Sequence, residues 1–339
     1  MAEFHSPVNH GTTGAPDVTV VMVPRERFSR TRESIDSLYR DPGVPFAFIC
    51  VDGGSPRSVA QALAEESRRR GFRLIRTEHF LMQNEARNLA IPQIEAKYVA
   101  FVDNDVEFAP GWLAALRRCA EETGADIVSP IVCWGEPAHT TVHFAGGDAT
   151  IELRDGERRF RESHRFYNEK LADVRADLVR QPCELAEFHC MLVRRDVFDR
   201  VGLLDEELKS IFEHVDFCMS VRAAGGSVMF EPNALVTYVM EARLGIGDLL
   251  YYFYRWNDDW SLASESYFHR KWNSVYTDEV TTGFTRPHRR RVWPSLRKRA
   301  QRVVGWRRSI YLYDVAANLF IWAARRRQSA LAPPRRLQA

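Results

Sequence analysis

Two carboxylates separated by one residue are the sharpest chemical feature of this sequence. Asp103, Asn104 and Asp105 follow directly on the apolar run Tyr98–Val102, which is typical of a buried strand. Carboxylates at positions i and i+2 after such a strand can bring two oxygens to one hard cation, and that cation can hold a diphosphate. A solvated acidic turn is the alternative for the triplet taken alone. Its place at the end of a strand favours the cation site.

Two more polar clusters follow apolar runs, namely Pro24-Arg25-Glu26 and Asp52-Gly53-Gly54. Strand-like runs alternate here with amphipathic helical segments, which predicts an α/β fold with a mostly parallel twisted sheet flanked by helices. In such sheets ligands bind beyond the carboxyl ends of the strands. The predicted strands are 18–23, 46–51, 72–76, 98–102 and 127–132, and the helices between them are 28–40, 84–91, 111–122 and one from Ser55 to Gly71.

The second half of the chain offers histidines and acids in two places. Residues 141–153 are predicted to form a hairpin that carries His143 and Gly146, with a further turn at Asp155-Gly156. Glu213, His214 and Asp216 lie at the start of a helix that runs to Ala224, before strands at 227–230 and 235–239. A side chain of these types can take a proton from an attacking hydroxyl group.

Taken together, the stretch from Val18 to about Val239 resembles a family 2 glycosyltransferase of the GT-A fold, the fold of nucleotide-diphospho-sugar transferases. Each motif is weak alone, whereas their order and spacing are specific. The motifs are the opening strand with Pro24, Val51–Ser55, Ala86–Asn88, Tyr98–Asp105 with Pro110–Trp112, and Phe212–Phe217.

The resemblance implies a donor site formed by Pro24, Arg25, Glu26, Asp52, Arg87, Asn88, Asp103 and Asn104. In the family, the residue at Asp52 bonds the nucleobase, and Arg87 and Asn88 lie near the nucleotide. Asp103 faces the ribose or sugar, and Asp105, with Asp103, binds Mg²⁺ or Mn²⁺. His143, Gly146 and Trp112 are expected on the acceptor side.

Two positions depart from the family pattern. His214 stands where the family usually has the carboxylate base, so His214, Glu213 and Asp216 all remain candidates for the base; His214 as a metal ligand or as a wall of the acceptor pocket is the alternative. Tyr238 stands where relatives often have a histidine metal ligand. A phenol is a poorer Mg²⁺ ligand, which predicts weak metal binding or binding mainly through substrate phosphates.

Charge is distributed unevenly along the 339 residues. From Arg286 to the end there are 15 Lys and Arg against one acid, Asp314, although the whole chain has a net charge of only +2. We predict a flexible arm (1–16), a GT-A domain (17–240) and a helical basic region (241–339). The basic region is expected to contact the body of the protein, an anionic membrane surface or a second copy in a homodimer; no recognition motif for nucleic acid accompanies it. A helix at 248–260 is predicted to pack on the catalytic domain.

Six scattered cysteines without a CxxC pair favour reduced thiols, and no apolar run approaches the ~18–20 residues that span a bilayer. We therefore predict a cytoplasmic protein, peripheral on the inner membrane face if the basic region attaches it. The resemblance implies transfer of a hexose-type sugar, with a UDP-linked donor favoured by the family, to a saccharide, lipid-linked or small-molecule hydroxyl with inversion. A nucleotidyltransferase, which would need a Gly-rich phosphate loop, and a non-catalytic scaffold that binds the nucleotide sugar are the alternatives.

Overall fold

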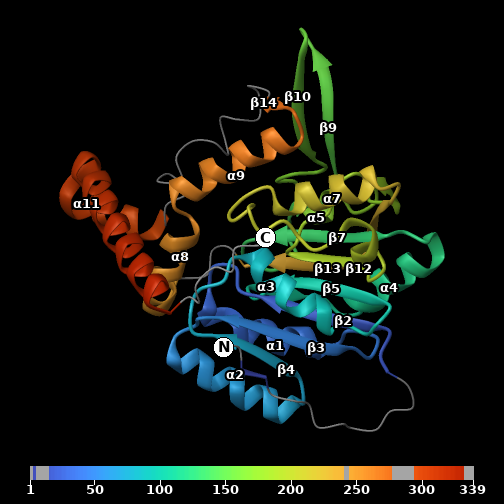
Figure 1. Ribbon diagram of the computed structural model, residues 1–339, viewed down its shortest axis with the longest axis horizontal. Helices are drawn as coiled ribbons and strands as arrows, with labels where there is room; N and C mark the ends of the chain where they lie inside the picture. Colours follow the sequence, from blue (N-terminus) through green and yellow to red (C-terminus); the bar gives the residue numbers. More distant parts are fainter. Residues whose placement is uncertain (1–2, 5–14, 240–243, 277–293, 332–339) are drawn as a thin grey trace, which may run out of the picture.

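The computed structural model describes residues 3–4, 15–239, 244–276 and 294–331, and its centre is a mixed sheet of 11 strands (Figure 1). One half of this sheet is parallel, and every residue of its two central strands, β2 and β5, is buried. Strands buried on both faces consist of continuous apolar residues, as these do. In spatial order the parallel strands are β4 (Arg73–Thr77), β3 (Ala47–Gly53), β2 (Val18–Val23) and β5 (Tyr98–Asp103).

The other half of the sheet mixes directions. β12 (Cys190–Arg194) lies antiparallel between β5 and β7 (Ile127–Trp134), and β13 (Val228–Tyr238) runs parallel to β7. The two strands predicted at 227–239 are this single strand β13, interrupted by a register shift between Glu231 and Leu235. The shorter strands β6 (Val106–Phe108), β8 (Thr141–Phe144) and β11 (Gln181–Cys183) pair antiparallel with β13, β7 and β13 respectively.

The predicted helices are confirmed with small shifts at their ends. α2 ends where expected, because Gly71 adopts the left-handed conformation at φ 73° that closes a helix. α1 presents Ile35 and Leu38, both fully buried, to the core. The helices of this part are η1 (Phe28–Arg30), α1 (Thr31–Arg40), α2 (Arg57–Arg70), α3 (Gln83–Ala90), η2 (Ile91–Gln93), α4 (Trp112–Thr123), α5 (Leu171–Val174), α6 (Val197–Val201) and α7 (Glu213–Ala223).

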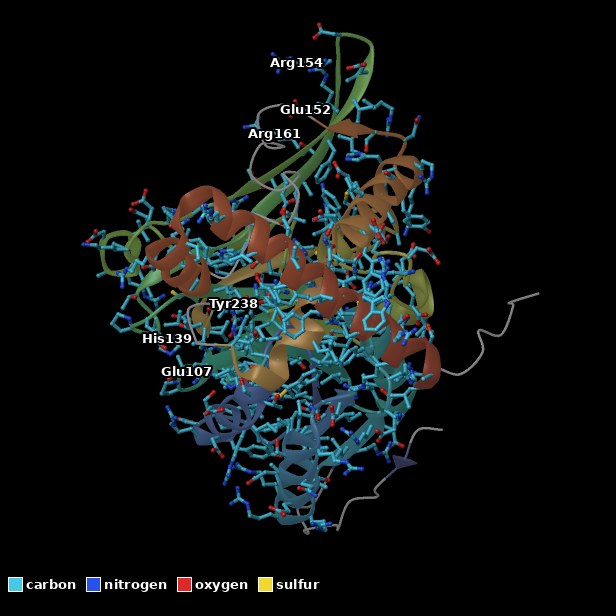
Figure 2. The ribbon with its side chains drawn as sticks, turned by 90° about the vertical axis from the view of Figure 1, so that its left-hand side faces the viewer. Glu107, His139, Glu152, Arg154, Arg161 and Tyr238 are labelled. Atoms are coloured by element: carbon cyan, nitrogen blue, oxygen red, sulfur yellow. The ribbon has the colours of Figure 1, made fainter. Side chains whose placement is uncertain are left out.

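The predicted hairpin at 141–153 is wrong in its pairing. β8 pairs with β7 in the main sheet, whereas β9 (Gly147–Arg154) pairs with β10 (Glu157–His164) in a separate small sheet with β14 (Val275–Tyr276). Gly146, at φ 79°, turns the chain between the two sheets. The turn at Asp155-Gly156 is confirmed, and the hairpin of β9 and β10 projects from the body in Figures 1 and 2.

The helix predicted at 248–260 is two helices, α8 (Leu249–Arg255) and α9 (Asp258–Lys271), because the Asn257 side chain accepts from Trp260 N–H and starts a new helix. α8, which follows η3 (Ile246–Asp248), is largely buried, so its packing on the body is confirmed. α11 (Pro294–Leu331), kinked at Gly305, lies beside α8 in Figure 1. The Phe320 ring of α11 stacks on the Phe253 ring of α8, with ring centroids 5.2 Å apart.

The predicted N-terminal arm lies mostly outside the described residues, but Glu3–Phe4 (β1) pair antiparallel with β4. All six cysteines are buried and free. Within the described parts of the chain, every helix is too short or too polar to cross a membrane.

Candidate active site

Asp103 ends β5 in a fully buried position and is surrounded by cations. Its Oδ2 lies 3.3 Å from the Arg25 guanidinium and 3.1 Å from His189 Nδ1, and its Oδ1 lies 3.4 Å from Arg87. Burial opposes ionisation, but Arg25 and His189 outweigh it and lower the pKa of Asp103. Asp103 is therefore a fixed negative charge at the centre of the site.

Asp105 lies on the same edge in a different environment. Its Oδ2 pairs with Arg27 at 3.1 Å, while Oδ1 is buried and accepts no hydrogen bond from the described residues. Burial raises the pKa of Asp105 to about 7 against the opposing effect of Arg27. One oxygen of this carboxylate is thus available to a cation or a donor group.

The middle residue of the triplet is structural. Asn104 accepts a hydrogen bond from the Arg25 amide at 2.8 Å, and its amide nitrogen donates to the Arg27 carbonyl at 3.2 Å and to the Thr31 hydroxyl at 2.9 Å. These bonds fasten the loop after β2 to the loop after β5. The order of the parallel strands puts both loops at one edge, as the sequence predicts.

Glu26 and Tyr238 complete this buried cluster. The Tyr238 hydroxyl donates to Glu26 Oε2 at 2.8 Å, the Trp256 indole donates to Oε1 at 2.9 Å, and Arg27 lies 2.9 Å from Oε2. Tyr238 also stacks on His189 with ring centroids 4.4 Å apart. Tyr238 therefore occupies the site, where its phenol positions other side chains. Figure 2 shows it on the same side of the body as Glu107 and His139.

Asp52 caps its own turn at the end of β3. It accepts from the Ser55 amide at 3.0 Å and the Ser55 hydroxyl at 2.8 Å, and it pairs with Arg76. The C-terminal helix reaches this turn, because Arg327 of α11 donates to the Gly54 carbonyl at 2.9 Å. The edge where the nucleobase is predicted is therefore bordered by a segment from the far end of the chain.

Arg87 and Asn88, adjacent on α3, point to different partners. Arg87 contacts Asp103 and lies 3.7 Å over the Phe188 ring, and burial lowers the pKa of its guanidinium to about 10. Asn88 instead donates to the Leu204 carbonyl at 2.8 Å and to Glu206 at 2.9 Å. Pro24 accepts from Gln83 at 3.1 Å.

The three candidate bases are not equivalent. Glu213 faces Arg255 at 3.6 Å, and Asp216 accepts from Lys271 and the Trp272 indole, both at 2.8 Å. Burial raises the pKa of Asp216 against the effect of Lys271.

His214 has the more exposed side chain, at 23% against 5% for Asp216, and its Nε2 lies 3.7 Å from Glu162 Oε1. Burial raises the pKa of Glu162, but the neighbouring imidazoles of His164 and His214 outweigh it and lower the pKa to about 2. Glu162 is therefore an ionised partner for His214.

Four residues of the site escaped the sequence analysis: Glu162, His164, Glu187 and His189. His164 Nε2 lies 2.8 Å from Glu162, and Glu187 Oε2 lies 3.3 Å from His143 Nε2 and 3.9 Å from His189 Nε2. A signal for them exists, since the pattern Glu-x-His occurs at 162–164 and again at 187–189. In an extended segment such as β10 this spacing places both side chains on one face, whereas residues 187–189 form a turn.

Two predicted acceptor residues have structural roles. Trp112 is fully buried against Phe108, with ring centroids 4.5 Å apart, so it has no surface to offer an acceptor. Gly146 is buried in the turn between β8 and β9, and a Cβ there would lie 3.4 Å from Phe230. His143 keeps 17% of its side chain exposed beside the other histidines.

The parallel half-sheet with acidic and basic side chains at its carboxyl edge defines a nucleotide-sugar transferase fold of the GT-A type. A GalNAc-T7 crystal structure with UDP, GalNAc and Mn²⁺ has a similar fold: the TM-score is 0.51 at 14% identity, and the match covers 80% of this chain and 59% of that one. Residues 19–202 match the family described as Glycosyl transferase family 2. The chain belongs to that family.

A curated relative, the uncharacterized protein y4gI of Sinorhizobium fredii, is 28% identical over 243 residues. The match covers 69% of this chain and 26% of that protein, so the chain spans about a quarter of the relative's length.

Proposed function

We propose that this protein transfers a sugar from a nucleoside diphosphate donor to an acceptor hydroxyl with inversion at the anomeric carbon. The observation that supports this most is the convergence of Asp103, Asp105, Arg25 and Arg87 at the carboxyl edge of the parallel strands. Family membership supports the reaction class. A UDP-hexose is the donor that the family resemblance favours.

Arg25 is the residue of this cluster best placed to meet the diphosphate. Its side chain is 19% exposed, whereas those of Arg27 and Arg87 are 5% and 1% exposed. A guanidinium binds phosphate oxygens through two parallel hydrogen bonds. Arg27 and Arg87 instead hold the carboxylates in place, and Asp52 is proposed to mark the nucleobase edge.

The residues present fit a divalent cation at Asp105, because its Oδ1 is a buried oxygen without a hydrogen-bond donor among the described residues. Asp105, together with Asp103, would hold Mg²⁺ or Mn²⁺. When bound, the cation supplies neutralisation of the negative charge that grows on the departing diphosphate.

His214 is our proposed base for the acceptor hydroxyl. Glu162 faces Nε2, which favours the tautomer protonated there and leaves the lone pair on Nδ1 to accept the proton. Glu213 and Asp216 are held by Arg255 and by Lys271 with Trp272, which suits them to positioning the segment.

The outer surface of α11 is proposed to attach the protein to an anionic membrane or to a second copy. Leu312, Leu319 and Trp322 are 50%, 61% and 55% exposed on a helix that also carries arginines. An apolar strip beside cationic side chains suits an interfacial helix.

Donor hydrolysis tests the proposed reaction. Purified protein is incubated with a panel of nucleotide sugars, with and without Mn²⁺ or Mg²⁺, and release of nucleoside diphosphate is followed. We expect slow release from one donor, lost in Asp105→Asn and retained in the control Asp196→Asn, an exposed acid that pairs with Arg194. NMR of the product formed with an acceptor then reports the anomeric configuration. Absence of release, together with no thermal shift on adding UDP, would instead support a non-catalytic protein.

A further inference from the structure

A second cluster of metal-binding side chains lies beside Asp103. His143 comes from β8, and Glu187 and His189 come from the segment that leads into β12. Each of the three offers one ligand atom, and these atoms lie within 4.8 Å of one another. We propose that His143, Glu187 and His189 bind a first-row divalent transition-metal ion, at a site separate from the cation proposed at Asp105.

The two imidazoles converge on one carboxylate oxygen. Glu187 Oε2 lies 3.3 Å from His143 Nε2 and 3.9 Å from His189 Nε2. Ligand atoms bound to one metal at about 2.0–2.2 Å are roughly 3–3.5 Å apart in tetrahedral or octahedral geometry. The pair formed by His143 and Glu187 already meets that spacing, and a small rotation of His189 would bring the third atom to it.

A simple ion pair between Glu187 and the two imidazoles accounts for this arrangement less well than a bound metal ion does. Glu187 Oε2 is buried and accepts no well-formed hydrogen bond from the residues described, although two imidazoles face it. A buried carboxylate oxygen without a donor is costly. A cation held between the carboxylate and the two imidazole nitrogens would remove that cost and explain why three polar groups point at one place.

The surroundings of His189 favour metal binding through Nε2. Its Nδ1 lies 3.1 Å from Asp103 Oδ2, close to the carboxylate but without a well-formed hydrogen bond, and the Tyr238 ring stacks on its face. A carboxylate beside one ring nitrogen keeps the proton on that nitrogen and directs the lone pair of the other nitrogen to the metal. Asp103 would thus orient a ligand of this site.

The ligand set selects the class of metal. Imidazole suits Zn²⁺, Fe²⁺, Co²⁺ and related ions, whereas Mg²⁺ and Ca²⁺ prefer oxygen ligands. Three protein ligands leave at least one coordination position open, as in catalytic metal sites. His143 keeps 17% of its side chain exposed, while the side chains of Glu187 and His189 are 8% and 4% exposed. The site is therefore reached from the side of His143.

Co²⁺ binding to the full-length protein tests the proposal without any activity measurement. Apoprotein is titrated with Co²⁺, and visible absorption together with nitrogen hyperfine coupling reports on the ligands. We expect one equivalent bound, with coupling to two imidazole nitrogens in the unaltered protein. Zn²⁺ should displace this Co²⁺, and Mg²⁺ should not.

Variants then identify the ligands. His143→Gln, Glu187→Gln and His189→Gln should each weaken Co²⁺ binding at least 10-fold. Asp105→Asn should retain the site, as should His269→Gln, which removes a histidine on α9. A folded protein that binds no Co²⁺, or binding without nitrogen coupling, would overturn the proposal. The proposal would also fail if the three ligand variants bound Co²⁺ with the same affinity as the unaltered protein. Because the readout is metal binding, failure of the proposed sugar transfer would leave this result intact.

Discussion

The proposed donor side and the proposed acceptor side of the site both contain buried carboxylates, and they differ in the partners of those carboxylates and in how the side chains are held. On the proposed donor side, Asp103 and Glu26 are each paired with arginines, and Glu26 also accepts hydrogen bonds from Tyr238 of β13 and from Trp256, which follows α8. On the proposed acceptor side, imidazoles from β8, β10, α7 and the segment that leads into β12 meet Glu162 and Glu187 at distances up to 3.9 Å.

The difference follows from the supports of the two sides. The donor side lies on neighbouring parallel strands, which fix their carboxyl ends against one another. The proposed acceptor side combines the main sheet with the projecting hairpin, so its side chains come from two different sheets and from α7. We infer that the donor side is preorganised and that the acceptor side completes its geometry on binding a metal ion or substrate.

Asp103→Ala should have the largest effect, because it leaves the buried guanidinium of Arg87 without its anion. Breaking such a buried pair costs about 3–5 kcal/mol of stability. Urea unfolding would measure this, and product formation should also be lost. The exposed pair of Asp196 and Arg194 provides the control, since Asp196→Ala should change stability by less than about 1 kcal/mol. A stable Asp103→Ala protein would show that the donor side is not preorganised.

His214→Ala should reduce sugar transfer roughly 10²–10⁴-fold, the usual contribution of a general base. Donor KM should change little, because His214 contacts Glu162 on the acceptor side. Steady-state kinetics with a hydroxyl acceptor would measure the effect on kcat separately from the effect on donor KM. If Asp216→Asn lowers kcat more than His214→Ala does, Asp216 is the base and the assignment of His214 fails.

Acid should weaken the donor side through Glu26. Burial raises its pKa, but Arg27 and Arg25 outweigh burial and lower it to about 2, below the ordinary value of 4.5. A carboxyl whose pKa is lowered in the folded state contributes stability above its ordinary pKa, and that contribution is lost as pH falls from about 4.5 towards 2. Urea midpoints between pH 6 and 3 should fall less steeply in Glu26→Gln than in the unaltered protein. If the urea midpoints of the two proteins fell equally steeply with pH, Glu26 would not be the source of the acid sensitivity.

The smallest effect is expected at the contact between α11 and the sheet edge proposed for the nucleobase. The Gln328 side chain accepts from the Phe80 amide at 2.8 Å and donates to the Phe80 carbonyl at 2.7 Å. Gln328→Ala should cost about 1–2 kcal/mol at roughly 1 kcal/mol per hydrogen bond, and should raise donor KM less than 10-fold. Ser329→Ala, which removes a bond within α11 only, is the control. An unchanged donor KM in Gln328→Ala would show that this contact of α11 does not affect donor binding.

Local patterns in the sequence are sufficient to predict which loops form the proposed donor side of the site. Strand runs that end in Pro24, Asp52 and Asp103 predict three loops on one sheet edge, because parallel strands align their carboxyl ends. The same reasoning misplaced residues 141–153, since the partners of β8 and β9 depend on pairings with β7 and β10 that local alternation does not encode. The family resemblance placed Trp112 on the acceptor side, although burial of that indole depends on how α4 packs.

Composition and the order and spacing of local motifs were enough to predict the family, the α/β order of elements and the acidic triplet after β5, because each motif lies within one short segment. The contacts of His143 with Glu187, of Tyr238 with Glu26 across 212 residues, and of Gln328 with Phe80 across 248 residues follow only from the folded structure. Such contacts depend on which strands become neighbours and how helices pack, and those choices are made by burial of the whole core.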